Sequence, residues 1–269
     1  MDYLVVKCGG SVLDNLPSSF YKNLVKLQQE GKCQPIIVHG GGPLISSLLT
    51  KLGVKTSFVN GLRVTTEDVL QVVEMVLSGS VNKQIVGKLQ KVGGDAYGIS
   101  GVDGKLLLAE QNGNESLGYV GDVVQVNAQM IHSIIDEGHI PVISPVGIGH
   151  DGQKYNINGD IAAAAVAKAL NGKLCFVSDI PGIYVKDDHE DMKTCHQLTK
   201  KEAMKLIQDE VITGGMIPKV TAAIDSLEHD VEQVVILNGM TKDSLLDYVS
   251  GKEIGTKFVR DGEMQYASY

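Results

Sequence analysis

Several residue types are scarce in this chain of 269 residues. It has no tryptophan, only four phenylalanines and only two arginines, Arg63 and Arg260. Lys and Arg number 24 against 32 Asp and Glu, which gives a net charge of −8, and no run of four basic residues occurs. A nucleic-acid binder needs clustered positive charge to displace counterions, so this composition excludes nucleic acid as a partner.

The chain also lacks long hydrophobic runs. The longest, Ile161 to Ala167, has seven residues, whereas a membrane-spanning helix needs about 20. The N-terminal sequence MDYLVVKCGG does not have the charged segment and long apolar stretch of a signal peptide. The four cysteines show no CxxC spacing, which favours reduced thiols. We therefore expect a cytoplasmic protein without a membrane segment.

Familiar catalytic motifs are missing too. There is no Walker A pattern, no G-x-S-x-G elbow and no His or Cys spacing typical of a zinc site. A G-x-G-x-x-G pattern does occur at Gly147–Gly152, but Gln153-Lys154-Tyr155 follows it instead of a helix. Because Asp-Gly is a common hairpin turn, Asp151-Gly152 predicts a β-hairpin here and not a dinucleotide site.

Short apolar runs of strand type alternate with segments of helical periodicity. The runs are Tyr3–Val6, Pro35–Val38, Ile140–Ser144, Leu174–Ser178 and Val234–Leu237. This alternation predicts an α/β fold with a mostly parallel sheet and helices on its faces.

Other segments have their own patterns. Glycine-punctuated alternation predicts β-hairpins over residues 95–126, which would lie over one end of the sheet. Thr65-x-x-Asp68 and Thr199-x-x-Glu202 predict capping boxes at two helix starts. Thr256–Val259 is expected to be an edge strand. A new strand–helix series begins after Asn171-Gly172-Lys173, so the boundary between two lobes is placed at residue 172.

Glycine, by contrast, is abundant: 31 of the 269 residues are glycine, well above the usual share of about 7%. Two clusters, Gly9-Gly10 and Gly40-Gly41-Gly42, follow the first two predicted strands. Ligands bind beyond the carboxyl ends of parallel strands, where glycine lets backbone N–H groups approach a phosphate. One isolated pair would indicate only a tight turn, but two such clusters favour an anion site.

Four polar residues stand out beside these clusters. Lys7 ends the first strand, and Lys219 opens a helix, where a cation is mildly unfavourable without a bound anion. Asp160 begins the alanine-rich helix, and Arg63 carries a guanidinium that suits a carboxylate. For each of them a structural role remains the alternative: solvent-exposed lysines and arginine, and an ordinary Asn or Asp helix cap.

Together these motifs resemble the amino acid kinase superfamily. The similarity rests on Lys7-x-Gly-Gly-Ser, His39-Gly-Gly-Gly-Pro, Asn60-Gly-Leu-Arg-Val-Thr, Asn156-x-Asn-x-Asp160, Ser178-Asp-x-x-Gly182 and Gly215-Met-x-x-Lys219, in this order along the chain. Within the superfamily, the third and fourth motifs are the most specific, and they make the chain most similar to the N-acetylglutamate kinases. Gly159 departs from that family, which often has alanine there.

The resemblance implies a three-layer α-β-α sandwich, with β-hairpins over the substrate site. It implies an acceptor lobe of residues 1–172 and an ATP lobe of residues 173–269, joined by one central sheet. The reaction would transfer the γ-phosphoryl group of ATP to the side-chain carboxylate of N-acetyl-L-glutamate, the second step of arginine biosynthesis. Such an acceptor is already ionised at neutral pH, so no general base is needed.

The resemblance also assigns roles to residues. Lys7 and Lys219 would be catalytic, with Asp160 orienting both. Substrate would bind Gly41, Gly42, Arg63 and Asn156. ATP would bind Gly9, Gly10, Asp179, Ile180, Pro181, Gly182, Ile183, Tyr184, Thr213, Gly214 and Gly215. Mg²⁺ would be held mainly by the phosphates and water, without a protein ligand.

Two matters stay open at this point. The acceptor could instead be carbamate, aspartate, glutamate or UMP, or the chain could be a non-catalytic nucleotide sensor or storage protein on the same scaffold. Arginine-inhibited family members carry an additional N-terminal helix that joins dimers into hexamers, and this chain begins at its first strand. We therefore expect a homodimer that arginine does not inhibit.

Overall fold

The computed structural model describes residues 2–186, 192–214 and 216–260. Its centre is a sheet in the order β14-β16-β15-β11-β1-β2-β8-β5. In chain order, these strands are β1 (Tyr3–Cys8), β2 (Gln34–His39), β5 (Ala96–Ser100), β8 (Ile140–Ser144), β11 (Lys173–Ser178), β14 (Gln197–Thr199), β15 (Gln233–Asn238) and β16 (Thr256–Val259). All neighbouring pairs are parallel except β15 and β16, so the expected mostly parallel sheet is confirmed.

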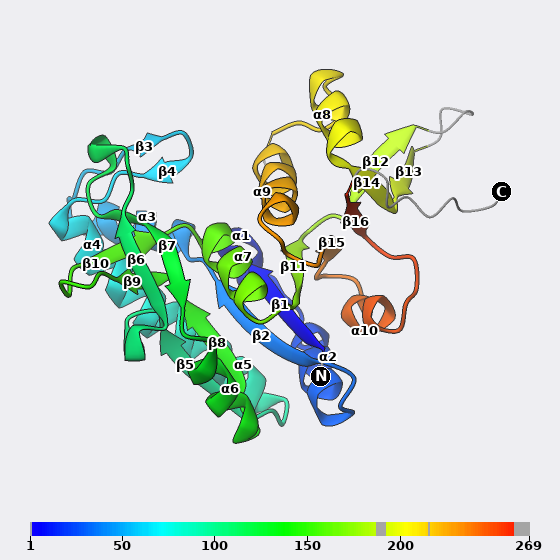
Figure 1. Ribbon diagram of the computed structural model, residues 1–269, viewed down its shortest axis with the longest axis horizontal. Helices are drawn as coiled ribbons and strands as arrows, with labels where there is room; N and C mark the ends of the chain where they lie inside the picture. Colours follow the sequence, from blue (N-terminus) through cyan, green and yellow to red (C-terminus); the bar gives the residue numbers. More distant parts are fainter. Residues whose placement is uncertain (1, 187–191, 215, 261–269) are drawn as a thin grey trace.

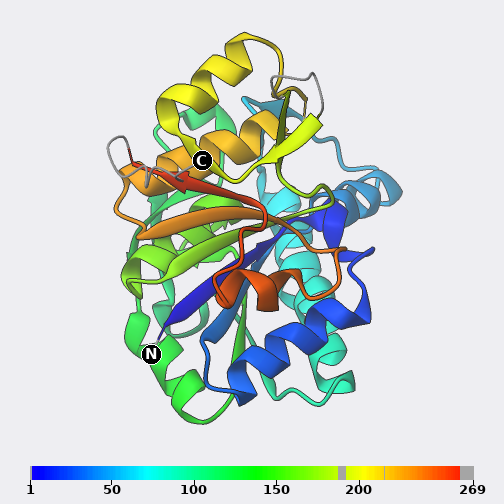
Figure 2. The same ribbon diagram turned by 90° about the vertical axis from the view of Figure 1, so that its right-hand side faces the viewer.

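Helices cover both faces of this sheet (Figures 1 and 2). Val5 of β1 faces a core shared with α6 (Ala128–Asp136), α7 (Gly159–Ala169), α8 (Lys200–Gln208) and α9 (Met216–Glu228). Leu4 and Val6 face the opposite core, shared with α1 (Gly10–Leu13), α2 (Ser18–Gln29), α3 (Gly42–Lys51), α4 (Glu67–Glu74), α5 (Asn82–Lys91) and α10 (Ser244–Val249). The period-two alternation of β1 thus produces the expected three layers.

Smaller sheets lie outside the central one. A closed barrel is formed by β6 (Leu107–Gln111), β7 (Val120–Val126), β9 (Val146–Ile148) and β10 (Lys154–Ile157). Two hairpins are β3 (Phe58–Val59) with β4 (Leu62–Arg63), and β12 (Ile183–Lys186) with β13 (Met192–Cys195). Short 3₁₀ turns, η2 (Asp103–Lys105) and η3 (Glu115–Leu117), flank β6. The antiparallel pairing of β9 with β10 confirms the hairpin predicted at Gly147–Gly152.

A π-helical segment, η1 (Met75–Val81), joins α4 to α5 without a break in the helical chain. Its Leu77 and Val81 side chains lie against Gly41: a Cβ added to Gly41 would be 2.8 Å from Leu77 Cδ2 and 3.2 Å from Val81 Cγ2. A side chain at position 41 would therefore force the Leu77 side chain to move. Such π segments are rare and often occur beside functional sites.

Three local predictions were wrong. Ala96–Ser100 is not part of a hairpin but the edge strand of the central sheet, parallel to β8. Its Gly98 does not form a turn but permits a close approach, because a Cβ there would overlap the side-chain oxygen of Asn82. The second hairpin-like part, β6 with β7, does pair antiparallel as expected.

The second error concerns Thr256–Val259, which lies between β14 and β15 and not at the edge. Edge and interior strands share the same local pattern, and only the long-range pairing distinguishes them. The third concerns the helix that follows Arg63. Its N-cap is Thr66, which accepts a hydrogen bond from Val69 N–H, because the Thr65 hydroxyl donates to the Arg63 carbonyl instead. The capping box of Thr199 and Glu202 is confirmed.

The carboxyl ends of β1 and β2 meet at one end of the sheet. There α1 and α3 begin, the β3–β4 hairpin rises on one side, and α9 rises on the other (Figure 1). Within the described ranges, no helix combines the length and apolar character required to cross a membrane.

Candidate active site

Two glycine loops are in contact at the end of the sheet. Cys8 and His39 are paired in register, and Gly40 N–H donates to the Cys8 carbonyl over 2.9 Å. A Cβ on Gly10 would lie 2.9 Å from both Gly42 N and Pro43 Cδ. Only glycine at position 10 therefore allows the two loops to pack this closely.

A cavity of about 160 Å³ opens beside the second loop. Of the residues predicted to bind the acceptor, all four line it: Gly41, Gly42, Arg63 and Asn156. Apolar side chains from the β3–β4 hairpin, the π segment and the barrel complete its wall: Phe58, Leu62, Leu77, Val120 and Ile157. The cavity thus combines a cation and amides with apolar walls, as a small carboxylate ligand requires.

Arg63 is buried, with 8% of its surface exposed. Its guanidinium donates to Thr56 Oγ1 (2.9 Å), Ser46 Oγ (2.7 Å) and the Gly42 carbonyl (3.2 Å), and lies 4.6 Å from the centre of the Phe58 ring. Burial lowers its pKa from the ordinary value. Among the described residues, no carboxylate forms an ion pair with it.

A buried cation with only neutral partners is costly, and a bound anion would compensate for it. Asn156 lies on the same wall, and its amide donates to the buried Thr65 hydroxyl over 3.0 Å. Thr65 therefore connects the two predicted acceptor-binding residues, because it also donates to the Arg63 carbonyl.

Two of the three predicted catalytic residues, Lys7 and Asp160, form an ion pair near the cavity. Lys7 Nζ is 2.7 Å from Asp160 Oδ1. Lys7 is a neighbour of Gly159, which lines the cavity: a Cβ added to Gly159 would be 3.5 Å from Lys7 Cε. Asp160 is held by the N-cap of α7, where Asn158 accepts hydrogen bonds from the Asp160 and Ile161 amides, as the Asn/Asp pattern predicted.

Lys219 approaches the same place from α9, on the opposite side of α7. Its ammonium group donates to the buried Ser178 hydroxyl, at the end of β11, over 3.3 Å. Burial lowers the pKa of Lys219, and the charge of Lys7 lowers it further, while Asp179 and Asp160 raise it. Two lysines and two aspartates therefore interact electrostatically at the junction of β1, β11, α7 and α9.

The residues predicted to bind ATP occupy three loops around this junction. Gly9 is the N-cap of α1 and Gly10 its first residue. Asp179 to Gly182 connect β11 to β12, which contains Ile183 and Tyr184. Thr213 and Gly214 precede α9. Gly215 lies outside the described residues, and no hydrogen bond among the described residues links Thr213 or Gly214 to the β11–β12 loop.

Sequence reasoning missed several residues that support the site. Thr65 was assigned to a helix cap, and Ser46 and Thr56 were not considered. Buried His39 and Asn82 form a hydrogen bond beside the second glycine loop. His39 stands within a motif that was recognised for its glycines, but no sequence signal pointed to Asn82, 43 positions away.

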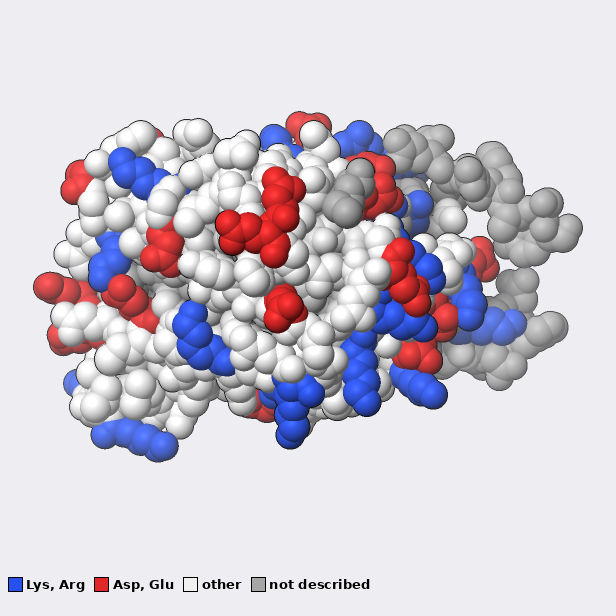
Figure 3. Space-filling model, turned by 90° about the horizontal axis from the view of Figure 1, so that it is seen from below, with Lys and Arg blue, Asp and Glu red and all other residues white. Residues whose placement is uncertain are grey.

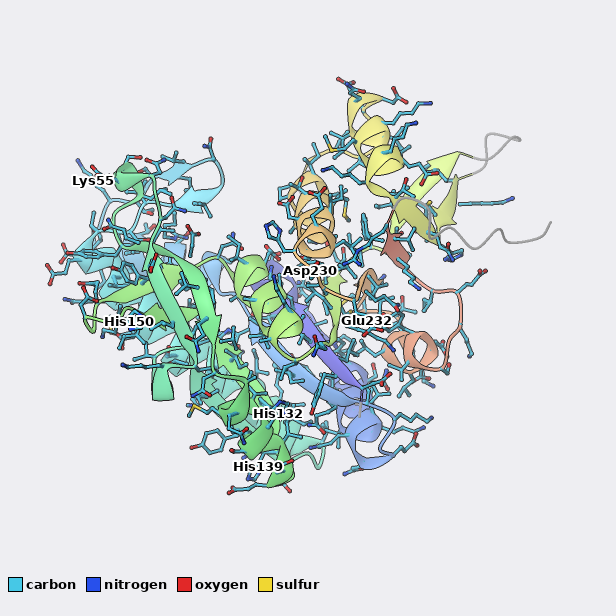
Figure 4. All side chains as sticks on the ribbon, viewed as in Figure 1. Lys55, His132, His139, His150, Asp230 and Glu232 are labelled. Atoms are coloured by element: carbon cyan, nitrogen blue, oxygen red, sulfur yellow. The ribbon has the colours of Figure 1, made fainter. Side chains whose placement is uncertain are left out.

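Histidines and charged side chains outside this site lie in other parts of the molecule. His132 and His139 lie at the end of the sheet opposite α1, and His150 lies at the β9–β10 hairpin (Figures 1 and 4). The face seen in Figure 3 carries both basic and acidic side chains. In the described part of the chain, no three or more His, Cys, Asp or Glu side chains are grouped to hold a metal ion.

Known proteins resemble this chain over most of its length. Residues 2–238 match the model of the amino acid kinase family. The acetylglutamate kinase of Oceanobacillus iheyensis is 50% identical over 256 residues, covering 95% of this chain and 96% of that protein. The acetylglutamate kinase of Halalkalibacterium halodurans is 48% identical, covering 95% of both.

Solved structures show the same fold. A Streptococcus mutans protein superposes with a TM-score of 0.80 at 30% identity, covering 96% of this chain and 98% of that one. Giardia carbamate kinase superposes with a TM-score of 0.67 at 14% identity, covering 97% of this chain and 99% of that one, which supports the fold alone. On the family match and the two close relatives, this chain belongs to the amino acid kinase family.

Proposed function

We propose that this chain is an N-acetylglutamate kinase, which transfers the γ-phosphoryl group of ATP to the side-chain carboxylate of N-acetyl-L-glutamate. This is the second step of arginine biosynthesis. The observation that carries the proposal is the cavity beside Lys7, in which buried Arg63 has no carboxylate partner among the described residues. The relatives named acetylglutamate kinase, which align over nearly the whole chain, support the choice of acceptor.

In this proposal the acceptor lies across the cavity. Its α-carboxylate binds the Arg63 guanidinium, and the Asn156 amide contacts the substrate nearby. Its side-chain carboxylate accepts hydrogen bonds from the Gly41 and Gly42 amides, which have no acceptor among the described residues. The apolar wall contacts the acyl group.

The transfer itself needs positioning and charge neutralisation. Lys7, on the cavity side, neutralises the transferring phosphoryl group, and Lys219 neutralises charge that develops on the ADP leaving group. Asp160 holds Lys7 by their ion pair and attracts Lys219 electrostatically. The acceptor attacks as a carboxylate, so no residue has to remove a proton.

ATP binds on the side of β11 and α9, in the lobe of residues 173–269, and the acceptor in the lobe of residues 1–172. Gly9 and Gly10 contact the phosphates, and the loops after β11 and before α9 line the nucleotide. Mg²⁺ accompanies ATP, held by phosphate oxygens and water.

We further propose a cytoplasmic homodimer. The four cysteines, all described, are free thiols, as in a reducing compartment. Among the described residues, strand β5 is the last strand at one edge of the central sheet, and its Tyr97 is 51% exposed. Proteins rarely leave such an edge open, so a second copy would cover it. Light scattering should give twice the chain mass of 28.8 kDa; a monomer would contradict this proposal.

The reaction is tested by measuring ADP release with MgATP and a panel of acceptors. N-acetylglutamate should be strongly preferred over glutamate, aspartate, carbamate and UMP. Trapping with hydroxylamine should give a hydroxamate, because the product is an acyl phosphate. A different preferred acceptor, or no hydroxamate, would overturn the assignment.

Arg63 is the residue that distinguishes the acceptor site from the nucleotide site. Arg63→Lys keeps the charge but loses the planar fork, so the KM for N-acetylglutamate should rise at least about tenfold. The KM for ATP should stay within about twofold, because Arg63 lies in the acceptor cavity. Equal changes in both values would show that Arg63 acts on the fold and not on the acceptor.

A further inference from the structure

His39 is a histidine in an unusual place: it ends β2, is fully buried, and directly precedes the glycine loop. Both ring nitrogens are hydrogen-bonded. Nδ1 lies 3.2 Å from the Gly40 carbonyl oxygen, and Nε2 lies 3.2 Å from the amide nitrogen of Asn82. A carbonyl can only accept and the Asn82 NH₂ group can only donate, so Nδ1 carries the proton and the ring is neutral.

The bond to Gly40 fixes the orientation of one peptide plane. In a trans peptide, the carbonyl oxygen of one residue and the N–H of the next point in opposite directions. The described chain contains no cis peptide. Holding the Gly40 carbonyl towards His39 therefore directs the Gly41 N–H away from His39. Gly41 lines the acceptor cavity, and its N–H has no acceptor among the described residues.

Asn82 anchors the histidine in turn. Its amide also donates to the carbonyl of Val142 (2.8 Å) in the middle of β8. The carbonyl oxygen of Ile99 in β5 lies 3.4 Å from the same nitrogen, and the Asn82 oxygen accepts from Lys83 (3.0 Å). Asn82 directly follows the π segment whose Leu77 and Val81 pack against Gly41. One side chain thus ties together three strands, the π segment and His39.

From this geometry we infer that His39, anchored by Asn82, is a positioning residue: it aims the Gly41 amide at the carboxylate that accepts the phosphoryl group. The inference rests on the proposed function and deepens it. His39 does not contact the substrate and transfers no proton. It acts through the peptide plane between Gly40 and Gly41.

Two matched variants separate this role from simple packing. His39→Asn places an amide N–H where Nδ1 stands and keeps the bond to Gly40, but loses the bond to Asn82. His39→Gln places an acceptor near Nε2 and keeps the bond to Asn82, but loses the donor to Gly40. Each variant therefore removes one of the two ring hydrogen bonds, so both should lower the free energy of unfolding by similar amounts.

Kinetics with purified full-length enzyme should then differ. We expect His39→Gln to lower kcat/KM for N-acetylglutamate at least about tenfold, since losing a donor of this kind outright costs ~10²–10³ in kcat. The KM for ATP should not change. The His39→Asn variant should instead keep most of the wild-type activity, because it keeps the bond to Gly40. Ser78→Ala, which removes a hydroxyl pair with Ser144 from the same π segment, serves as the control with unchanged kinetics.

The outcomes are distinguishable. Equal activity in the two His39 variants, or losses that follow their melting temperatures, would overturn the positioning role while the wild-type enzyme still phosphorylates N-acetylglutamate. Failure of the wild-type enzyme itself to use this acceptor would instead overturn the proposed function.

Discussion

Lys7 and Lys219 have different surroundings although they carry the same charge. Lys7 is paired with a carboxylate at 2.7 Å, whereas the hydrogen-bond partner of Lys219 is the neutral hydroxyl of Ser178 at 3.3 Å. Burial therefore lowers the pKa of Lys219 from its ordinary value. In the proposed function, the polyphosphate of ATP would compensate for the energetic cost of this half-buried ammonium.

This difference predicts a pH dependence. Lys219 loses its proton at a pH below the ordinary lysine value of about 10.4, so kcat/KM for ATP should fall on the alkaline side at that lower pH. In Lys219→Arg this decline should move to higher pH, even if the maximal rate is lower, because arginine stays protonated. An unchanged alkaline decline in the arginine variant would show that another group controls it.

His39 predicts a second pH effect, on stability. Burial lowers its pKa from 6.5 to about 4, so between these values the unfolded chain binds a proton that the folded chain does not. The contribution of His39 to the free energy of unfolding is therefore greatest above pH 6.5 and decreases as the pH falls towards 4. Between pH 7.5 and 5.0, the free energy of unfolding should fall by about 2 kcal/mol more in the wild type than in His39→Asn. Urea unfolding at both pH values measures this difference, and equal losses would contradict it.

At the scale of the elements, helices α1 and α7 can be compared because each begins with a glycine. Gly10 is the first residue of α1 and Gly159 the first residue of α7. A Cβ on Gly10 would lie 2.9 Å from the backbone of the neighbouring loop, whereas one on Gly159 would have only ordinary contacts of 3.5 Å or more. The glycine that departs from the family pattern therefore has room for the alanine that the family often has there.

Gly159→Ala should raise the free energy of unfolding by roughly 0.5–1 kcal/mol and leave activity within about twofold, because alanine restricts the unfolded chain. Gly10→Ala should reduce activity by at least about tenfold, because it separates the two glycine loops at the site. Thermal melts and ADP release assays test both variants. A loss of stability in Gly159→Ala, or full activity in Gly10→Ala, would contradict the packing described here.

Elements with strong local patterns were predictable from sequence. The buried strand runs, the Asn158 cap and the Thr199 capping box depend on neighbouring residues, and the structure has all of them. Elements defined by long-range pairing were not: β5 and β16 were misplaced because local alternation does not specify a partner strand. The same holds for the candidate site. Its motif residues could be proposed from sequence, whereas the hydrogen bond between Asn82 and His39 joins residues that only the fold brings together.

The whole molecule does not divide at residue 172 into two independent cores. The two hydrophobic cores lie on opposite faces of the sheet, and each contains residues from both sides of that position. Val5 shares one core with Phe176 and Ile236, and Val6 shares the other with Val177 and Val235. Strands β1 and β11 also pair directly in the middle of the sheet. The two parts proposed to bind the acceptor and the nucleotide thus belong to one packed unit.

We therefore predict that the chain unfolds in a single cooperative transition, because neither half can keep its core when the other unfolds. The fragment of residues 1–172 should not fold alone, since it would expose the β1 edge and the part of each core that later residues cover. Calorimetry and far-ultraviolet circular dichroism should give coincident midpoints with equal calorimetric and van't Hoff enthalpies. N-acetylglutamate and ATP should each move this one midpoint upwards, because each binds only the folded chain. Two transitions, of which only one responds to each ligand, would instead show that the lobes fold independently.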